Sequence, residues 1–461
     1  MEKTLEEILV EGRKPDEIIA DLKTKELVIP AWSDLEKEYN PKKHPIMVDP
    51  SYVDILRADG KTEKVTRVAV PLQKLAAARI TQMCFGLPVK RVYKPKDDNE
   101  KKVAVILEKI FLKNRINSVN IDRGVKLFAS CESATFWYAV EKDNNFYGEQ
   151  SKLKLRCKSY SPMNGDAIYP LFDEDDDMIA LSLNYTRVTG TLTVEYFDVF
   201  TNTKHHQWKR KLTDNVWTES VNEKITLTKI PAVYIYRSKP IWEDSNNDVY
   251  EIEWTLSRNG NYIRKNSKPL FVIFSDEETQ IGKEQPNEGK AVLQYPKGSE
   301  AKYVTWEQAT ESIKFQIESL FRTFFTGLQL PDMSFDSMKT APMSGEARKM
   351  MFIDAQMKVL QEQGAWLEMF DREVNVVKEY MKIMFPKYAN AIDSLLVENI
   401  ITPFVISDEK ETINNIMTAT GGAPVLSQRE GVEYLGWSED VEKTMGELKS
   451  EKTADVMNPT E

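Results

Sequence analysis

The chain of 461 residues is long enough for two to four domains, and its 41% hydrophobic and 29% charged content is that of a folded soluble protein. Its 62 Lys and Arg against 72 Asp and Glu give a net charge of -10, which argues against tight, sequence-specific nucleic-acid binding, since such proteins carry a basic excess. No apolar run reaches the length of a membrane span, and residues 1–14 lack the apolar core of a secretory signal.

Three cysteines lie far apart in the sequence, in apolar or strand-like surroundings. They are Cys84, Cys131 and Cys157. Because they are widely separated, we expect buried free thiols in a reducing compartment and not a metal site or a redox pair.

The N-terminal part is predicted to be mainly helical. Short acidic helices are expected over residues 1–40, and the prolines from Pro30 to Pro50 indicate an extended, irregular crossing. A helix with strand-like edges follows over Val65–Val92, and further helices are expected over Lys101–Lys113 and Ile121–Ser133. The apolar positions of the first segment are Leu5, Ile8, Leu9, Ile18, Ile19 and Leu22.

From Thr135 to Ile235 the sequence alternates between apolar and polar residues and is rich in aromatics. Runs of period two, separated by clusters of Gly, Asn and Asp, predict an antiparallel sheet or a partly open barrel. The acidic run Asp173–Asp177 could suggest a metal site, but no further carboxylate or histidine accompanies it at ligand spacing. We expect a solvated turn there.

The next segment is predicted to form a stalk that carries a small β tip. Asp244–Asn266 has an apolar stripe at helical spacing, and Trp306–Leu328 has another. Between them, Leu270–Val304 is expected to be a compact β insert. A helix that leaves and a helix that returns therefore bracket the insert.

After the stalk, residues 330–343 are predicted to be a loop, because a turn residue occurs every few positions. Ser344 is the expected N-cap of a long helix that ends before Pro386, and Glu346 lies in its first turn. Such a helix would be about 60 Å long, too long for the core of an ordinary domain. It needs a partner surface, which other copies of the chain could supply. Its apolar positions are Met350, Leu360, Leu367, Phe370, Val374, Val377 and Met381.

The C-terminal part is expected to be helical. An extended stretch over Ile400–Val405 precedes a helix over Asp408–Thr418, and Gly421–Pro424 breaks the chain. Ser427 is the expected cap of the next helix. A last helix is predicted over Glu439–Lys452, with a disordered tail after Thr453.

Motifs of catalysis are largely missing from the sequence. Gly282–Ala291 resembles a phosphate-binding loop, but the spacing of its glycines is wrong and Ala291 stands where a magnesium-binding Ser or Thr is needed. His205 and His206 are expected to be a surface pair on a hairpin, and His44 has no obvious partner. Binding or assembly is therefore the favoured class, with no enzymatic activity, no cofactor and no metal.

Basic residues on the two stalk helices allow two interpretations. They form an ordinary solvated helix face, or some of them face a DNA duplex in a central channel. In the second case each copy makes weak, salt-sensitive phosphate contacts without base specificity. The candidates are Arg258, Arg264, Lys265, Lys268, Lys314 and Arg322.

Five segments together resemble the portal proteins of long-tailed bacteriophages, and the resemblance covers nearly the whole chain. Those segments, in chain order, are TRVAVPLQKLAAARITQMCFGLPVK, SPMNGDAIYPLFDE, KIPAVYIYR, LPDMSFDSMKTAPMSGEARKM and LSQREGVEYLGWSEDVEKTMGELKSE. No single one is diagnostic, but their order and spacing carry the likeness.

The resemblance implies an α+β fold and a ring, commonly of twelve subunits, at one vertex of a virion capsid. The ring would nucleate shell assembly in the host bacterial cytoplasm and conduct double-stranded DNA in packaging and ejection. Its implied partners are the terminase large subunit, a head-tail adaptor, and the major capsid and scaffold proteins, with no membrane. The implied parts are a wing (1–240 and 345–404), two stem helices (241–268 and 305–329), a clip (269–304), a tunnel loop (330–344) and a crown (405–461).

In that loop we expect steric wedging of DNA, because Lys339 is its only base and methionines give soft contacts. The expected contact residues are Met333, Asp336, Met338, Lys339 and Met343. Two rival functions remain open at this point: a ring-forming head-tail adaptor with no direct DNA role, and a nucleic-acid-processing enzyme such as a packaging ATPase. The second would need the phosphate-binding loop that the sequence lacks.

Overall fold

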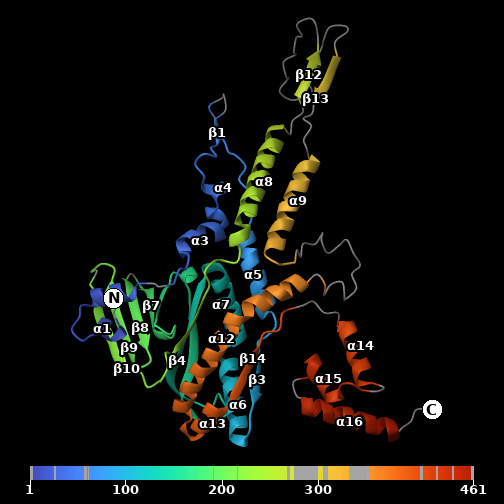
Figure 1. Ribbon diagram of the computed structural model, residues 1–461. Coiled ribbons are helices and arrows are strands. Elements are labelled where there is room, and N and C mark those ends of the chain that lie inside the picture. The colour runs from blue at the N-terminus through green and yellow to red at the C-terminus, as the bar shows by residue number, and fades with distance from the viewer. Residues whose placement is uncertain are drawn as a thin grey trace.

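In the computed structural model, a body of sheets and helices carries a projecting pair of helices with two strands at its tip, and a helical C-terminal group lies to one side (Figure 1). The structure describes the following residues: 4–24, 27–56, 60, 62–190, 192–214, 216–266, 270–274, 300–304, 310–331, 350, 352–404, 409–421, 424–438 and 441–457. Helices and strands both contribute substantially, which confirms the predicted α+β class.

A five-stranded antiparallel sheet forms one end of the body, in the order β10-β9-β8-β7-β6. The short helices α1 (Leu5–Ile8) and α2 (Pro15–Leu22) cover one of its faces, where Ile18 packs with Phe197 and Trp208. The predicted apolar positions of the N-terminal segment are thus explained. The strands are β6 (Ala167–Phe172), β7 (Met178–Thr189), β8 (Leu192–Thr201), β9 (Lys204–Lys211) and β10 (Thr218–Lys224).

A second antiparallel sheet, β11-β4-β5, packs against the other face of the first sheet. It consists of β4 (Glu132–Asn144), β5 (Ser151–Tyr160) and β11 (Ala232–Tyr236). The antiparallel prediction is confirmed, but the partly open barrel is wrong. The chain leaves β5 through a 3-10 turn over Pro162–Asn164, so β5 and β6 do not pair and two separate sheets result.

The main core lies where helices pack on the inner face of the three-stranded sheet. Gly124 lies where α7 crosses α5 so closely that a Cβ there would come within 2.8 Å of the Thr81 methyl group. The Asp97 side chain caps α6, and Cys131, with φ of 64°, ends α7 before β4 begins. The helix predicted over Ile121–Ser133 therefore starts and ends earlier. The helices are α5 (Leu72–Phe85), α6 (Asp98–Lys113), α7 (Ile116–Ser130), α12 (Ile353–Met384) and α13 (Ala389–Ser394).

Helix α12 crosses this core and is the longest helix among the described residues, about 48 Å at 1.5 Å per residue. Its second half is buried in its own chain, with Phe370, Val377 and Met381 fully inaccessible. Beyond it, β14 (Leu396–Ile400) pairs with β3 (Lys90–Lys94), so the extended segment begins earlier than predicted. The expected N-cap Ser344 and Glu346 lie outside the described residues.

A fully buried ion pair joins α7, α12 and β4. The guanidinium of Arg123 donates to both carboxylate oxygens of Glu373, at 2.8 and 2.9 Å, and the Trp137 indole N–H donates to the same carboxylate at 3.2 Å. Asn120 accepts a further bond from Arg123 at 2.6 Å. Burial alone would raise the pKa of Glu373, but the charge and hydrogen bonds of Arg123 outweigh it and lower that pKa.

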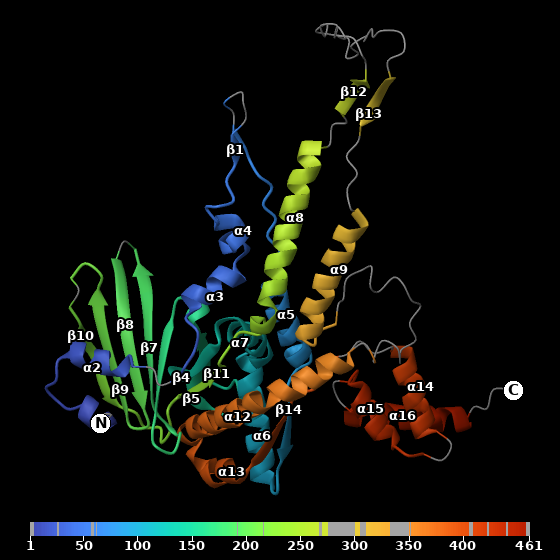
Figure 2. The same cartoon turned by 45° about the horizontal axis from the view of Figure 1, so that its top comes forward.

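The projecting helices are α8 (Asn246–Asn266) and α9 (Thr310–Gly327), and the strands at their tip are β12 (Leu270–Phe274) and β13 (Glu300–Val304) (Figures 1 and 2). Both helices and the β tip agree with the predicted stalk. Residues before Asn246 form a 3-10 turn, so α8 starts slightly later than expected. Beside α8 lie α3 (Trp32–Tyr39), α4 (Pro45–Val48), β1 (Ile55–Leu56) and β2 (Thr62–Glu63).

Three helices form the C-terminal group: α14 (Glu409–Thr420), α15 (Gln428–Leu435) and α16 (Val441–Met457). Ser427 caps α15 as predicted, in a reciprocal capping box with Glu430. Helix α16 continues past Thr453, so the tail expected to be disordered is helical over its first residues.

The cysteine prediction is confirmed in its main point, since all three thiols are free. Cys84 and Cys131 are buried and Cys157 is half-buried, and burial raises the pKa of each thiol to about 12. None of the helices in the described part of the chain is long and apolar enough to cross a membrane.

Removing the charge of Glu373 should destabilise the body strongly. In Glu373→Gln the buried Arg123 loses its counterion, and we expect the free energy of unfolding to fall by about 3–5 kcal/mol. Urea-induced unfolding followed by tryptophan fluorescence measures this.

The matched control is Glu398→Gln, which makes the same chemical change in an exposed pair, Lys94–Glu398. There we expect a loss of under about 1 kcal/mol. Equal losses in the two variants would contradict a special role for the buried pair.

Candidate functional site

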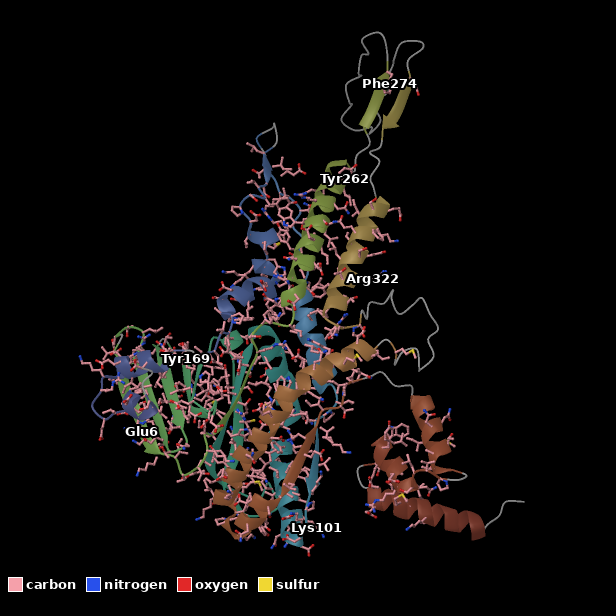
Figure 3. The ribbon with its side chains drawn as sticks, viewed as in Figure 1. Glu6, Lys101, Tyr169, Tyr262, Phe274 and Arg322 are labelled. Atoms are coloured by element: carbon pink, nitrogen blue, oxygen red, sulfur yellow. The ribbon has the colours of Figure 1, made fainter. Side chains whose placement is uncertain are left out.

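The stem, defined here as α8 and α9, is the part of the molecule for which DNA contact was predicted. At its base, Phe324 and Phe325 of α9 and the following Leu328 are buried, whereas Phe315 farther out is 73% exposed. Figure 3 shows the labelled side chains Tyr262 and Arg322 on the two helices and Phe274 at the tip. The stem is therefore anchored at one end and open to contact along its length.

One face of α8 is covered by an extended segment, Val65–Val70, which we call the strap. Three side chains of α8 accept hydrogen bonds from strap N–H groups: Glu253 from Val70 at 2.8 Å, Ser257 from Val68 at 2.9 Å, and Asn261 from Thr66 at 2.6 Å. The acceptors are four residues apart on the helix, and the donors are two residues apart on the strap. The strap thus runs antiparallel to α8, and its otherwise unpaired N–H groups are satisfied by the helix.

Close approach of the strap requires a glycine in α8. A Cβ at Gly260 would lie 2.7 Å from the Thr66 methyl group. Tyr52 contacts both the strap and α8. Its hydroxyl donates to the Thr66 carbonyl at 3.1 Å and accepts from the Asn261 amide. Its ring packs on Trp254, with the ring centroids 5.0 Å apart.

At the base of the strap, Glu253 also bonds to His44, and both side chains are almost fully buried. His44 Nδ1 lies 2.6 Å from the carboxylate, and Nε2 lies 2.6 Å from the Glu38 carbonyl oxygen. A carbonyl oxygen only accepts, so Nε2 carries a hydrogen, and Nδ1 shares a second one with Glu253. His44 therefore has a structural role in joining α8 to the N-terminal segment.

The predicted basic residues that the structure describes lie on both stem helices. Arg258 is exposed and lies over the Trp254 ring at 5.2 Å, and Lys265 lies seven residues farther along the same helix. Arg264 points toward the strap and donates to the Lys64 carbonyl at 3.4 Å.

On α9, Lys314 is 3.9 Å from Glu318 and Arg322 is exposed. Glu311 and Glu318 share the exposed side of the helix with these bases. The described surface of the stem thus carries both charges, and DNA contact by its bases stays a prediction. Lys268 and all five predicted loop residues lie outside the described residues. They are Met333, Asp336, Met338, Lys339 and Met343.

Two other predicted features are resolved on the five-stranded sheet. Asp173–Asp177 forms an exposed turn in which the Asp173 carboxylate accepts from the N–H groups of Asp175 and Asp177. The surface-pair prediction for the histidines is wrong for His206, which is buried, stacks on Trp208 and has its pKa lowered by burial. In the described part of the chain, no group of three metal-ligating side chains comes together.

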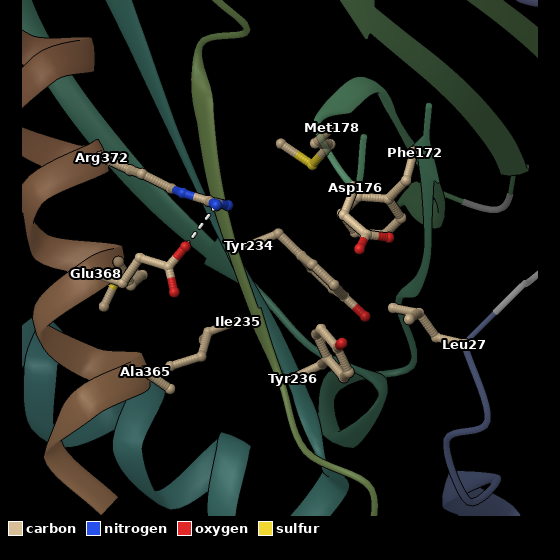
Figure 4. Close-up of a pocket in the computed structure, with 11 residues that line it drawn as sticks. Leu27, Phe172, Asp176, Met178, Tyr234, Ile235, Tyr236, Ala365, Glu368 and Arg372 are labelled. Atoms are coloured by element: carbon tan, nitrogen blue, oxygen red, sulfur yellow. Dashed lines mark hydrogen bonds and ion pairs between the residues drawn. The ribbon is translucent and has the colours of Figure 1, made fainter. Parts of the chain in front are cut away.

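A cavity of about 340 Å³ lies between α12, β11 and the turn that joins β6 and β7 (Figure 4). Tyr234 and Tyr236 line it, and Arg372 is held by Glu368 at 2.6 Å. The Tyr234 hydroxyl donates to Glu132 at 3.0 Å, and burial raises its pKa. Among its lining residues we find no nucleophile with an adjacent base, so the cavity does not suggest a reaction.

Sequence reasoning found the apolar stripe of α8 but missed its polar ridge. Glu253, Ser257 and Asn261 recur every four residues, and a search for polar residues at helical spacing could have found them. Their partners in the strap could not be found in this way, because any extended segment offers the same N–H groups.

Comparison with known proteins gives one informative match. The sequence profile of the family described as "Phage portal protein, SPP1 Gp6-like" matches residues 25–457. No curated protein sequence matches significantly.

Two solved structures are similar at low identity. One is from the neck of an empty GTA particle computed with C6 symmetry: 10% identity, TM-score 0.41, 87% of this chain and 95% of that chain covered. The other is from the neck of a native GTA particle computed with C12 symmetry: 12% identity, TM-score 0.39, coverage 88% and 93%. These TM-scores are too low to establish a shared fold.

Adding one methyl group at Gly260 should loosen the strap. We expect Gly260→Ala to speed hydrogen exchange at the amides of Thr66 and Val68, because the new Cβ would meet the Thr66 methyl group at 2.7 Å. Exchange followed by mass spectrometry measures this.

Gly364→Ala in α12 is the control, since a Cβ there has no neighbour within 4 Å. It should leave exchange in the strap unchanged and raise stability by up to about 1 kcal/mol. Unaltered exchange in the Gly260 variant would show that the strap does not depend on this close contact.

Proposed function

The chain belongs to the SPP1 Gp6-like family of phage portal proteins, and from this premise we propose that its copies form a ring at one capsid vertex. Double-stranded DNA passes through the ring during packaging and leaves through it during ejection. The ring contains twelve copies in this proposal. The match over residues 25–457 supports this assignment for nearly the whole chain.

One observation supports self-assembly in particular: the first half of α12 exposes more large apolar side chains than the second half does. In the second half, the exposed side chains include Glu368, Asp371 and Arg372. In the first half, apolar side chains are exposed along a stripe with spacings of three and four. They are Ile353 at 44%, Met357 at 54% and Leu360 at 56% exposure, and Met350, three residues before the helix begins, is 71% exposed. A stripe of this spacing is typical of helix packing, so a partner is expected to cover it.

The proposed partners follow from the family. The clip, residues 269–304 at the end of the stem, receives the terminase large subunit and later a head-tail adaptor. The wing, residues 1–240 and 345–404, meets the major capsid and scaffold proteins, and residues 405–461 form the crown. Residues 241–268 and 305–329 are the stem helices of the ring.

In this proposal the protein is a passive conduit and not an enzyme. The net charge of -10 keeps most of the wall repulsive to DNA, and the mixed charges of the stem allow only brief phosphate contacts. Such contacts are weak and salt-sensitive, which keeps the barrier to sliding low. The loop over residues 330–344 wedges the duplex sterically.

Ring formation is the first test. We expect the purified full-length chain to form rings with a central hole as wide as a DNA duplex in negative-stain electron microscopy. The variant Met357→Glu/Leu360→Glu should remain folded but monomeric, because it puts charges into the apolar stripe.

The control variant is Val28→Glu/Val188→Glu, at isolated exposed positions (90% and 71%), and it should still form rings. A wild-type chain that stays monomeric under assembly-promoting conditions would contradict the proposed function. Normal rings from the α12 variant would contradict only the role of the stripe.

A second test concerns the loop. Shortening it by residues 332–340 should reduce DNA packaging or retention in particles while rings still form, because the steric wedge is removed. Lys339→Gln should have little effect, since the wedge does not depend on its charge. Wild-type packaging by the shortened variant, measured as DNA protected from nuclease, would remove the proposed role of the loop.

A further inference from the structure

Strand β5 carries a row of four cations that the proposed conduit does not use. Lys152, Lys154, Arg156 and Lys158 occupy every second position, so all four lie on one face of the three-stranded sheet. The alternate residues turn inward, where Leu155 is buried in the main core. At about 3.3 Å per residue, the row is about 20 Å long.

Aromatic rings lie over two of these cations, while the carboxylates of Asp166, Glu141 and Asp143 lie near the ends of the row without forming an ion pair with it. Lys154 lies over Phe146 at 5.2 Å, and Lys158 lies over Tyr160 at 4.5 Å and Tyr185 at 5.9 Å. Within the described part of the chain, none of the four cations of the row has an ion-pair partner. Three of the four, all but the half-buried Lys154, are exposed, so the row is open to a ligand.

The positive surface continues onto the neighbouring five-stranded sheet, which lies beside β4 and β5 in Figure 2. Arg187 of β7 lies over Tyr185 at 5.2 Å and over Tyr196 at 5.6 Å. In the register of β8 and β9, Lys209 is opposite Tyr196. We call the whole surface the basic face. It consists of Lys152, Lys154, Arg156, Lys158, Arg187 and Lys209.

Such a concentration of cations is unusual for this chain, whose net charge is -10. Several other exposed lysines are held by nearby acids, as Lys94 is by Glu398 at 2.6 Å and Lys387 by Glu149 at 2.8 Å, whereas the row places side by side four cations that have no ion pair among the described residues. Unpaired like charges repel one another and destabilise the folded state unless an anion neutralises them. The basic face therefore indicates an anionic ligand.

We propose that the basic face binds the phosphate backbone of double-stranded DNA, at a site separate from the stem and independent of ring formation. An extended row of cations matches an extended polyanion better than a compact acidic turn. The acidic turn at Asp173–Asp177 is also a poor occupant from a second copy, because the Asp173 carboxylate is bonded to its own backbone. Lysine and arginine contacts of this kind read no base sequence.

Tyr138 of β4 is paired with Arg156 of β5. Its exposed ring adds an apolar surface beside the charges. Lysine and arginine stems can lie along such rings while their charged ends reach phosphates. The binding is therefore expected to be moderate, independent of sequence and strongly dependent on salt.

The test is a four-fold substitution, Lys152→Gln/Lys154→Gln/Arg156→Gln/Lys158→Gln, in the full-length chain. Its affinity for a 30-base-pair duplex of arbitrary sequence is measured by fluorescence anisotropy over a series of salt concentrations. We expect affinity at low salt to fall by at least about tenfold, and the slope of log K against log salt to fall by about 3 to 4.

A matched control makes the same charge change at four ion-paired surface lysines: Lys37→Gln/Lys94→Gln/Lys101→Gln/Lys387→Gln. Its affinity should fall by no more than about twofold. A charge-retaining variant, Lys152→Arg/Lys154→Arg/Lys158→Arg, should bind as the wild type does, and thermal unfolding checks that every variant is folded.

Three outcomes would overturn the proposal. Equal losses in the test and control variants would show only a general effect of net charge. Unchanged DNA binding with loss of ring assembly would show that a second copy covers the basic face. No change in either property would show that the row has no ligand of this kind. None of these outcomes would decide whether the chain forms a portal ring, which the electron microscopy tests separately.

Discussion

The buried pair of Arg123 and Glu373 is the contact on which the arrangement of the body depends. It ties α7 to the middle of α12, and the Trp137 indole brings β4 into the same cluster. A charge with no access to water is tolerated only where its counterion is fixed, so moving these three elements apart would leave a buried charge without its partner. Helix α12 is thereby held across the core, with one side buried along its length and exposed apolar side chains in its first half.

Charge is distributed unevenly over the resulting molecule. The stem mixes acids and bases, while the row on β5 concentrates, on one face of the three-stranded sheet, cations that have no ion pair within the described part of the chain. A chain that is acidic overall can thus repel DNA over most of its surface and still hold it at a defined place. The proposed conduit needs the first property, and the proposed wing site adds the second.

Periodicity carried most of what could be predicted. The stalk helices and the long helix have apolar stripes, and the strands alternate, so their existence and approximate bounds follow from the sequence. Two other features could not be predicted from periodicity. Helix α7 ends where Cys131 takes a left-handed conformation, and the two sheets separate at Pro162. The basic row was visible as KLKLRCK, but its importance depends on the absence of ion pairs to it among the described residues, which only the folded chain reveals.

The row of hydrogen bonds between α8 and the strap can contain only a few bonds, because the helix and the extended chain have different repeat lengths. Four residues of helix rise about 6.0 Å, whereas two residues of extended chain advance about 6.6 Å. Each successive bond is therefore displaced by roughly 0.6 Å more, and beyond three or four bonds the donors fall out of range. The two unlike periods therefore limit how long an extended segment can be held by a single row of helix side chains, and the contact next to Thr66, from Arg264 to the Lys64 carbonyl, already uses a side chain outside that row.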